Sequence, residues 1–263
     1  MPIRDNMQYT TQRPMALGKS GRKSLGTCLL VLASVLSVTA LAQNYDEFFK
    51  KCYANGDPDQ TIIACSAVIT KGLDDNIDLA TAFKNRGNAY DDKGRYDRAL
   101  EDYDQAVTIN PHDADALNNR GTTHSAMGHY DLAIRDYDQA IRLNPSSAMA
   151  LNNRCFAKAL SGQFEQALED CNESLRIKPK NPGALASRGF VYLKLKLYDA
   201  AIADYDAELH VSPDDPYSLF GRGTAKYMKG DLRGSDVDIV AAESIRSDIV
   251  DHMAKLGVQL GKL

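Results

Sequence analysis

The feature that most constrains this 263-residue chain is a 34-residue period that begins at Ala80. The segment Phe83 to Tyr90 aligns with the segment that starts at Leu117, and the same phase returns at Leu151, Leu185 and Leu219. A fixed period of this length is typical of a solenoid, in which each unit buries its apolar face only against its neighbours. The period therefore predicts a stack of similar units.

Each unit has the pattern of two short helices joined by a turn. Apolar and small residues recur at i, i+4 and i+7 before the turn at Gly94 and again after it, and Pro111 ends the second helix. Glycine supplies the backbone freedom that such a turn requires. Helices this short are marginal in water by themselves, so stacking of the hairpins must stabilise them.

These residues resemble the tetratricopeptide repeat, whose consensus places an aromatic residue, Leu-Gly, Tyr, Ala, Phe and Pro at fixed spacing. The first full unit reads Phe83, Arg86-Gly87, Tyr90, Ala99, Tyr103 and Pro111. The resemblance, to an exported bacterial type, implies an all-α, right-handed solenoid of helical hairpins with a C-terminal capping helix. It places five units at residues 80–113, 114–147, 148–181, 182–215 and 216–249, and the capping helix at 250–263.

The four cysteines beyond residue 42 fall two to a unit, one on each helix of a hairpin. Residues 43–79 fit a degenerate hairpin, in which Cys52 takes the place of Tyr90 and Cys65 that of Tyr103. Because these positions face each other across the hairpin, we expect a disulfide between Cys52 and Cys65. Cys155 and Cys171 replace the consensus glycine and aromatic residue of one unit. We expect them to be small buried free thiols, with a disulfide as the alternative.

The first 42 residues have the pattern of a secretory signal peptide. A basic cluster at Lys19, Arg22 and Lys23 precedes a 14-residue apolar stretch at 25–38, and Ala40-Leu41-Ala42 offers a cleavage site. A membrane span needs about 20 apolar residues. We therefore predict a secreted, periplasmic protein without an integral membrane span after cleavage, the alternative being an uncleaved N-terminal anchor.

Cleavage would change the charge of the chain. Residues 1–42 carry a net charge of +4 and the whole chain −4, so residues 43–263 carry −8. An acidic protein without a basic run argues against nucleic acid and anionic membrane surfaces as partners. The even number of remaining cysteines is typical of an oxidising compartment.

An arginine and an aspartate recur 16 residues apart in every unit. The arginines take the place of the consensus leucine on a helix face that should be largely buried, and a buried guanidinium needs a carboxylate. The sequence therefore predicts five structural ion pairs, within a unit or to a neighbour: Arg86 with Asp102, Arg120 with Asp136, Arg154 with Asp170, Arg188 with Asp204 and Arg222 with Asp238.

The sequence contains no pattern of catalytic or metal-binding residues. The five histidines are scattered, and none has a partner at the spacing of a zinc site. His124 occupies the Tyr90-equivalent position and is expected to be a packed core residue. We expect neither a cofactor nor an enzymatic activity.

The resemblance implies that the first helix of each unit lines a concave groove that binds a protein or peptide. The inward positions of the last three units are rich in aromatic residues, and we expect partner-binding residues at Phe156, Phe190, Tyr217, Phe220 and Tyr227. In the polar half, Lys84, Asn88 and Asn119 match the start of a carboxylate clamp, which Met149 and Asn153 interrupt. The alternative is that the C-terminal helix or a second copy covers the aromatic patch.

These observations predict a non-enzymatic, exported scaffold that binds a protein or peptide partner. Two alternatives remain open: a self-assembling solenoid that forms a homo-oligomer through the aromatic patch, and a carrier of an apolar ligand.

Overall fold

The computed structural model of the protein describes residues 46–54, 56–73 and 75–260. The predicted signal peptide and its cleavage site lie outside these residues. The described residues from 48 onward belong to one compact unit. Residues 46–53 are helical, and the helices that follow are α2 (Pro58–Lys71), α3 (Asn76–Asp92), α4 (Tyr96–Ile109), α5 (Ala114–Ala126), α6 (Tyr130–Leu143), α7 (Ala148–Leu160), α8 (Phe164–Ile177), α9 (Pro182–Lys194), α10 (Tyr198–Leu209), α11 (Pro216–Met228), α12 (Leu232–Ile245) and α13 (Ile249–Lys255).

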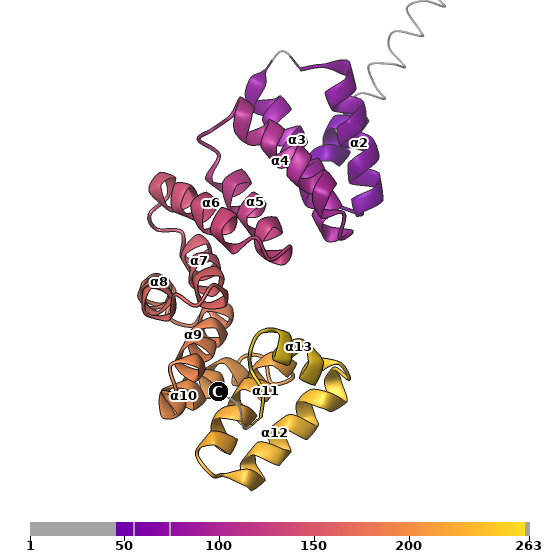
Figure 1. Cartoon of the computed structure of the whole chain (residues 1–263). Coiled ribbons are helices and arrows are strands. Elements are labelled where there is room, and N and C mark those ends of the chain that lie inside the picture. Colours follow the sequence, from indigo (N-terminus) through magenta and orange to yellow (C-terminus); the bar gives the residue numbers. More distant parts are fainter. Residues whose placement is uncertain (1–45, 55, 74, 261–263) are drawn as a thin grey trace, which may run out of the picture. The chain divides into compact units, whose positions relative to one another are not determined.

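The helices pack in the order in which they occur in the chain. From α3 to α12 they form five hairpins, and the second helix of each hairpin packs on the first helix of the next (Figure 1). Helices α5, α7, α9 and α11 begin 34 residues apart. This arrangement confirms the expected all-α fold of stacked helical hairpins. Among the described residues, no helix is both long and apolar enough to cross a membrane.

A close contact between glycine and tyrosine holds the two helices of a hairpin together. A Cβ atom added to Gly87 would lie 2.9 Å from the ring of Tyr103, and the equivalent distance is 2.8 Å for Gly121 and Tyr137. Real Cβ atoms do not approach carbon atoms so closely, so only glycine allows the ring to pack against the first helix. Both tyrosines are 1% exposed.

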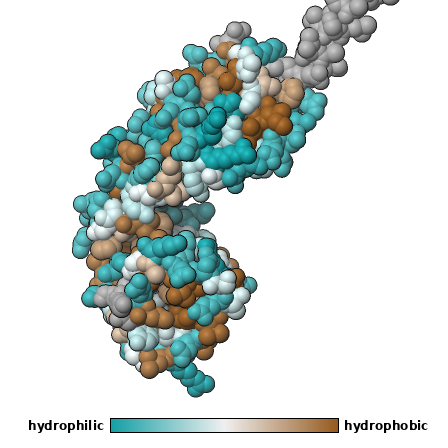
Figure 2. Space-filling model, turned by 45° about the vertical axis from the view of Figure 1, so that its right-hand side comes forward, coloured by the Kyte–Doolittle hydropathy of each residue, from teal (hydrophilic) through white to brown (hydrophobic). Residues whose placement is uncertain are grey.

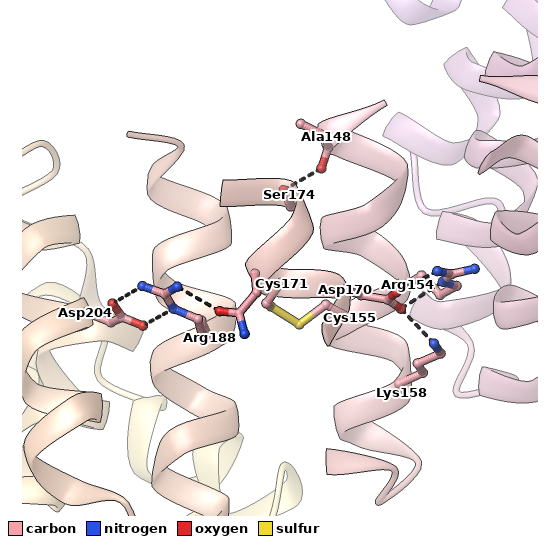
Figure 3. Close-up of a disulfide and its surroundings, with 10 residues drawn as sticks. Ala148, Arg154, Cys155, Lys158, Asp170, Cys171, Ser174, Arg188 and Asp204 are labelled. Atoms are coloured by element: carbon pink, nitrogen blue, oxygen red, sulfur yellow. Dashed lines mark hydrogen bonds and ion pairs between the residues drawn. A yellow bond between two sulfur atoms is a disulfide. The ribbon is translucent and has the colours of Figure 1, made fainter. Parts of the chain in front are cut away.

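Two hairpins are cross-linked by disulfides, and the one in the third unit takes the place of this contact. Cys52 is bonded to Cys65 with a Cα–Cα distance of 4.7 Å, as expected from their positions. Cys155 is bonded to Cys171 across α7 and α8, with a Cα–Cα distance of 5.4 Å (Figure 3). The prediction of free thiols at Cys155 and Cys171 is therefore wrong. A cysteine side chain is too short to span the hairpin as a tyrosine ring does. The bonded sulfur atoms of Cys155 and Cys171 link the two helices instead.

The five predicted ion pairs all form within their own units, and each is bidentate. In the third unit, Nε and Nη2 of Arg154 donate to Asp170 at 2.8 and 2.5 Å. The aspartate side chains are 3–9% exposed and the arginine side chains 18–22%. The two-point geometry matches a guanidinium to a carboxylate and satisfies the buried charge.

Each arginine also reaches the preceding hairpin through its Nη1 atom. Arg120 donates to Asp104, Arg154 to Asp138 and Arg222 to Asp206, each at 2.7 Å. Arg188 donates to Asn172 and Arg86 to Ser66, each at 2.9 Å. The repeated arginine therefore ties one unit to the next, in addition to closing its own hairpin (Figure 3).

Helix α13 closes the C-terminal end of the stack. It packs on α11 and α12, and Ile249, Met253 and Val258 are at most 3% exposed. Lys194 Nζ donates to the carbonyl oxygen of Gly257 at 2.8 Å, which attaches the end of the chain to α9. This segment contributes one wall of the groove described next.

Candidate functional site: a groove lined by the first helices

A groove of about 620 Å³ runs along the first helices of the second to fifth units. Side chains from α5, α7, α9 and α11 line it, together with residues of α6 and α13. Most of these first-helix residues stand at the inward positions expected from the helical phase; Asn153, Ser187 and Ser218 do not. The volume is within the range of pockets that bind small molecules or short peptide segments.

The groove is lined by a mainly apolar surface together with several polar side chains. The apolar lining residues include Tyr130, Phe156, Leu160, Ala186, Phe190, Tyr217, Met253 and Leu256. The polar ones include Thr122, Ser125, Asn152, Asn153, Ser187, Asp215 and His252. Gly183 also lines the groove, and a Cβ atom added there would make an ordinary van der Waals contact with Asn152, 3.7 Å from its Nδ2 atom.

The structure brings together three of the five predicted aromatic residues. Phe156, Phe190 and Tyr217 all line the groove, and the rings of Phe156 and Phe190 meet edge to face with their centroids 5.7 Å apart. Phe190 is 5% exposed, so only a small part of its side chain is accessible.

The remaining two aromatic residues do not line the groove. Phe220 is 1% exposed and lies in the core, so its predicted place on the binding surface is wrong. It belongs to the cluster of buried side chains that α13 helps to close, together with Ile249 and Met253. Tyr227 is 40% exposed but is not a lining residue. The C-terminal helix thus covers one end of the expected aromatic patch, as the alternative of a covering C-terminal helix predicted. The end at Phe156 stays open.

Tyr217 is held between two residues of the C-terminal segment. The ring of His252 lies edge to face with that of Tyr217 at 5.3 Å between centroids. The guanidinium of Arg246 lies 5.3 Å from the same ring and donates to its hydroxyl group. Arg246 is paired in turn with Asp248 at 2.7 Å. These contacts fix the position of the aromatic wall.

In the polar half, a chain of asparagine amides connects three first helices. Nδ2 of Asn153 donates to Asn118 at 3.1 Å, Asn118 to Asn119 at 3.3 Å, and Asn119 to Asn88 at 2.9 Å. The Tyr103 hydroxyl also donates to Asn88 Oδ1, at 2.7 Å. Asn88 and Asn119, expected to contact a partner, therefore already bond to each other. The sequence reasoning missed this chain, although Asn-Asn recurs at 118 and 152.

Lys84, the third polar residue expected to bind a partner, is engaged in an ion pair. Its Nζ atom lies 2.8 Å from Asp113 Oδ2, while Asp113 Oδ1 accepts from the backbone N–H groups of Asp115 and Ala116 and caps α5. Burial raises the pKa of Asp113, but the hydrogen bond from Lys84 and those from the backbone outweigh it and lower the pKa overall. Lys84 thus neutralises a helix cap and presents no free charge to a carboxylate ligand.

The residues that line the groove include one carboxylate, that of Asp215, but no lysine or arginine. Asp215 lines the groove and caps α11, with Oδ2 accepting from Ser218 N at 2.7 Å. Close by, Glu208 is 4% exposed, and its Oε2 atom has no hydrogen-bond partner among the described residues. Burial raises the pKa of Glu208, and the charge of Asp215 raises it further.

His124 is packed between helices. Burial lowers its pKa from 6.5, the charge of Asp136 opposes this shift, and the charges of Arg120 and His129 add to it. Its Nε2 atom is 4.0 Å from Asp136, and its Nδ1 atom has no partner within the described ranges. Among all the residues that the structure describes, no group of three or more His, Cys, Asp or Glu side chains could hold a metal ion.

Comparisons with known proteins agree with this architecture. Residues 80–113 and 114–147 each match the family described as tetratricopeptide repeat. No curated protein matches the chain. A tetratricopeptide repeat protein from Parabacteroides merdae is similar in structure, with a TM-score of 0.65 at 20% identity over 81% of this chain and 88% of that one.

Two further structures share the fold. YrrB, described as a tetratricopeptide repeat protein with an unusual peptide-binding site, has a TM-score of 0.53 at 18% identity over 74% of this chain and 96% of its own. The protein TTC0263 of Thermus thermophilus has a TM-score of 0.56 at 21% identity over 68% and 97%. Two units of this chain, residues 80–147, therefore match the tetratricopeptide repeat family, and the whole stack of hairpins has the fold of these solved tetratricopeptide repeat proteins.

Proposed function

We propose that this protein is an exported, non-enzymatic scaffold that binds a segment of a protein or peptide partner in the groove between α5 and α13. The observation that carries the proposal is the open groove of about 620 Å³, whose wall holds Phe156, Phe190 and Tyr217. Apolar and aromatic surface of this kind supplies most of the binding energy in protein interfaces. YrrB, which has a similar fold and is described as having an unusual peptide-binding site, offers an analogy that extends to this chain only as part of the proposal.

The binding surface that we propose is smaller than the one expected from the sequence. Phe156, Phe190 and Tyr217 form its apolar part, and Phe220 supports them from the core. Asn88 and Asn119 lie beyond its polar end and would have to exchange an internal hydrogen bond for one with the partner. Lys84 would have to give up Asp113. We therefore place the main contacts at the aromatic end.

Export is the second part of the proposal. The two disulfides support it, because disulfides persist in oxidising compartments such as the periplasm and are rare in the cytosol. We expect the mature chain to begin at Gln43, which mass spectrometry of the intact protein from a periplasmic extract would measure. An intact N-terminus in the membrane fraction would instead indicate an uncleaved anchor.

A second candidate function is self-association through α12. This helix exposes Val237 and Val240, which are 65% and 63% exposed, together with Leu232 at 56%. Figure 2 shows that hydrophobic side chains gather over the C-terminal helices at the bottom of the view, whereas the upper part is mostly hydrophilic. Exposed apolar patches often mark interaction sites. Light scattering over a range of concentrations would detect a dimer that Val237→Lys abolishes.

In-cell photo-crosslinking separates the two candidates. A benzophenone amino acid at Phe156 reports on the groove, and the same probe at Val237 reports on α12. A discrete heterologous protein captured from position 156 and not from 237 supports the groove. Adducts to a second copy from position 237 support self-association. Adducts from position 156 that remain within the chain would overturn the groove proposal.

A further inference from the structure

The charge of the groove distinguishes between classes of partner. Asp215 stands on its wall, and no Lys or Arg is among the lining residues. Within the described residues, neither Asp215 nor the nearby Glu208 makes an ion pair with a basic side chain. Asp215, a carboxylate without a counter-charge next to apolar walls, produces a negative potential that low-dielectric surroundings strengthen.

Two cations near this end are already engaged. Arg246 contacts Tyr217 but is bound to Asp248. Lys194 donates to the Gly257 carbonyl oxygen, and burial lowers its pKa. Neither cation compensates Asp215.

The polar end of the first helices carries the same sign. Asp92 and Asp115 are exposed and make no ion pair among the described residues, whereas Lys84 is neutralised by Asp113. An acidic partner would therefore meet repulsion from both ends of the first-helix surface, and a basic one attraction.

The aromatic wall suits a basic side chain as well. Arg246 already demonstrates that a guanidinium packs on the ring of Tyr217, at 5.3 Å from the centroid. Aromatic faces attract Lys and Arg through the ring quadrupole, and the methylene groups of these side chains pack on apolar surface. Phe156, which also lines the groove, offers a second aromatic surface.

We infer that the groove binds a segment that combines apolar side chains with at least one lysine or arginine, the apolar groups against Phe156, Phe190 and Leu256 and the cation beside Asp215. This inference rests on the proposed function of the groove. It excludes acidic segments and free carboxylate tails as the preferred ligands.

Selection from a displayed library of random linear dodecapeptides tests both the proposed peptide binding in the groove and the inferred preference for a basic residue. Three proteins are used: the wild type, Gly183→Gln, which fills the groove, and Ala207→Gln, which adds the same side chain on an exposed face of α10. Gly183 has no left-handed backbone and its added Cβ would make ordinary contacts, so the helix should accept the change. Peptides selected by the wild type and Ala207→Gln but not by Gly183→Gln are groove ligands.

The charge inference is then measured on one selected peptide by fluorescence anisotropy. We expect groove ligands enriched in Lys or Arg beside apolar residues, and a loss of about fivefold or more in affinity when the basic residue is changed to Gln or when Asp215→Asn removes the carboxylate. Asparagine is as good a helix cap as aspartate, so this variant should keep α11 intact. Asp236→Asn, on the exposed face of α12, is the matched control and should leave the affinity unchanged.

The outcomes distinguish a failure of the charge inference from a failure of the proposed function. Groove ligands that are neutral or acidic, or that bind Asp215→Asn as tightly as the wild type, would overturn the inference and leave the proposed function standing. A selection that yields no peptide sensitive to Gly183→Gln would overturn the proposed function and the inference with it.

Discussion

Cys155 is bonded to Cys171 at the two positions where the first, second and fourth units pack a glycine against a tyrosine ring. The same two positions therefore hold a hairpin together by two different means, a covalent bond in the third unit and a glycine–aromatic contact in its neighbours. The neighbouring residues Arg154 and Asp170 pair as in every other unit (Figure 3). The disulfide is thus a local replacement within an otherwise unchanged hairpin.

Replacing the disulfide by a glycine–tyrosine pair tests whether the two kinds of contact stabilise the hairpin equally. The double variant Cys155→Ala/Cys171→Ala loses the cross-link and should lower the free energy of unfolding by about 2–4 kcal/mol. The variant Cys155→Gly/Cys171→Tyr restores the contact of the other units and should recover most of that loss. Urea denaturation without reductant measures both. Equal instability of the two variants would show that the positions are not equivalent.

The two carboxylates that bind one arginine should differ strongly in their contribution to stability. Asp136 and Asp104 both accept hydrogen bonds from Arg120, but their side chains are 9% and 62% exposed. Asp136→Asn leaves a largely buried guanidinium without its main partner and should cost about 3 kcal/mol. Asp104→Asn weakens an exposed pair and should cost less than about 1 kcal/mol.

Chemical denaturation of these two variants gives the comparison. Asp170 and Asp138, which bind Arg154 in the same way, provide an independent repeat of it. If the exposed and the buried aspartate contributed equally within each pair, the arginine would not act mainly through its own hairpin.

His124 should make stability depend on pH below neutrality. Burial lowers its pKa in the folded state below 6.5, so the unfolded chain binds a proton more readily than the folded one. The contribution to stability is complete above pH 6.5, decreases as the pH falls below that value, and stops changing below the folded-state pKa. Asp136, Arg120, His129 and Asp104 are the charged groups that influence this residue.

The variant His124→Tyr, which places the residue of Tyr90 at this position, should remove that pH dependence. The measurement is the free energy of unfolding between pH 7.5 and 5 for the wild type and the variant. His129→Gln, at an exposed turn, is the control and should retain most of the slope. A slope that His124→Tyr leaves unchanged would contradict the assignment.

Lys196 has a backbone conformation that the other units give to glycine. Its φ angle is 61°, and the equivalent turn residues Gly94, Gly128, Gly162 and Gly230 have φ angles between 65° and 87°. A left-handed conformation costs a residue with a side chain about 1–2 kcal/mol. Lys196→Gly should therefore raise the free energy of unfolding by about 1 kcal/mol and Gly162→Lys should lower it by a similar amount. Thermal unfolding of both variants checks the opposite signs.

The repeat made much of the fold predictable. The apolar period indicated helical hairpins, and the constant spacing of 16 residues indicated the partner of each arginine, because both positions lie on facing helices of one hairpin. The third contact of each arginine was not predicted, since it joins two units. Asp104, Asp138 and Asp206 do recur at a fixed spacing and could have indicated it.

The candidate site was less predictable because it depends on how distant segments pack. The helical phase placed Phe156, Phe190 and Tyr217 on one surface, and the structure brings them to one groove. The same phase did not show that Phe220 would be buried, because its burial depends on the cluster closed by α13. Nor did it show that Lys84 pairs with Asp113, a residue of the next unit's helix cap.

The most direct test of the central claim is the affinity of the partner recovered by crosslinking, measured by calorimetry with the wild type, Gly183→Gln and Ala207→Gln. If the groove is the working surface, Gly183→Gln should weaken binding by tenfold or more, about 1.4 kcal/mol, while Ala207→Gln binds as the wild type does. Equal affinities for all three proteins would contradict the account and place the partner on another surface.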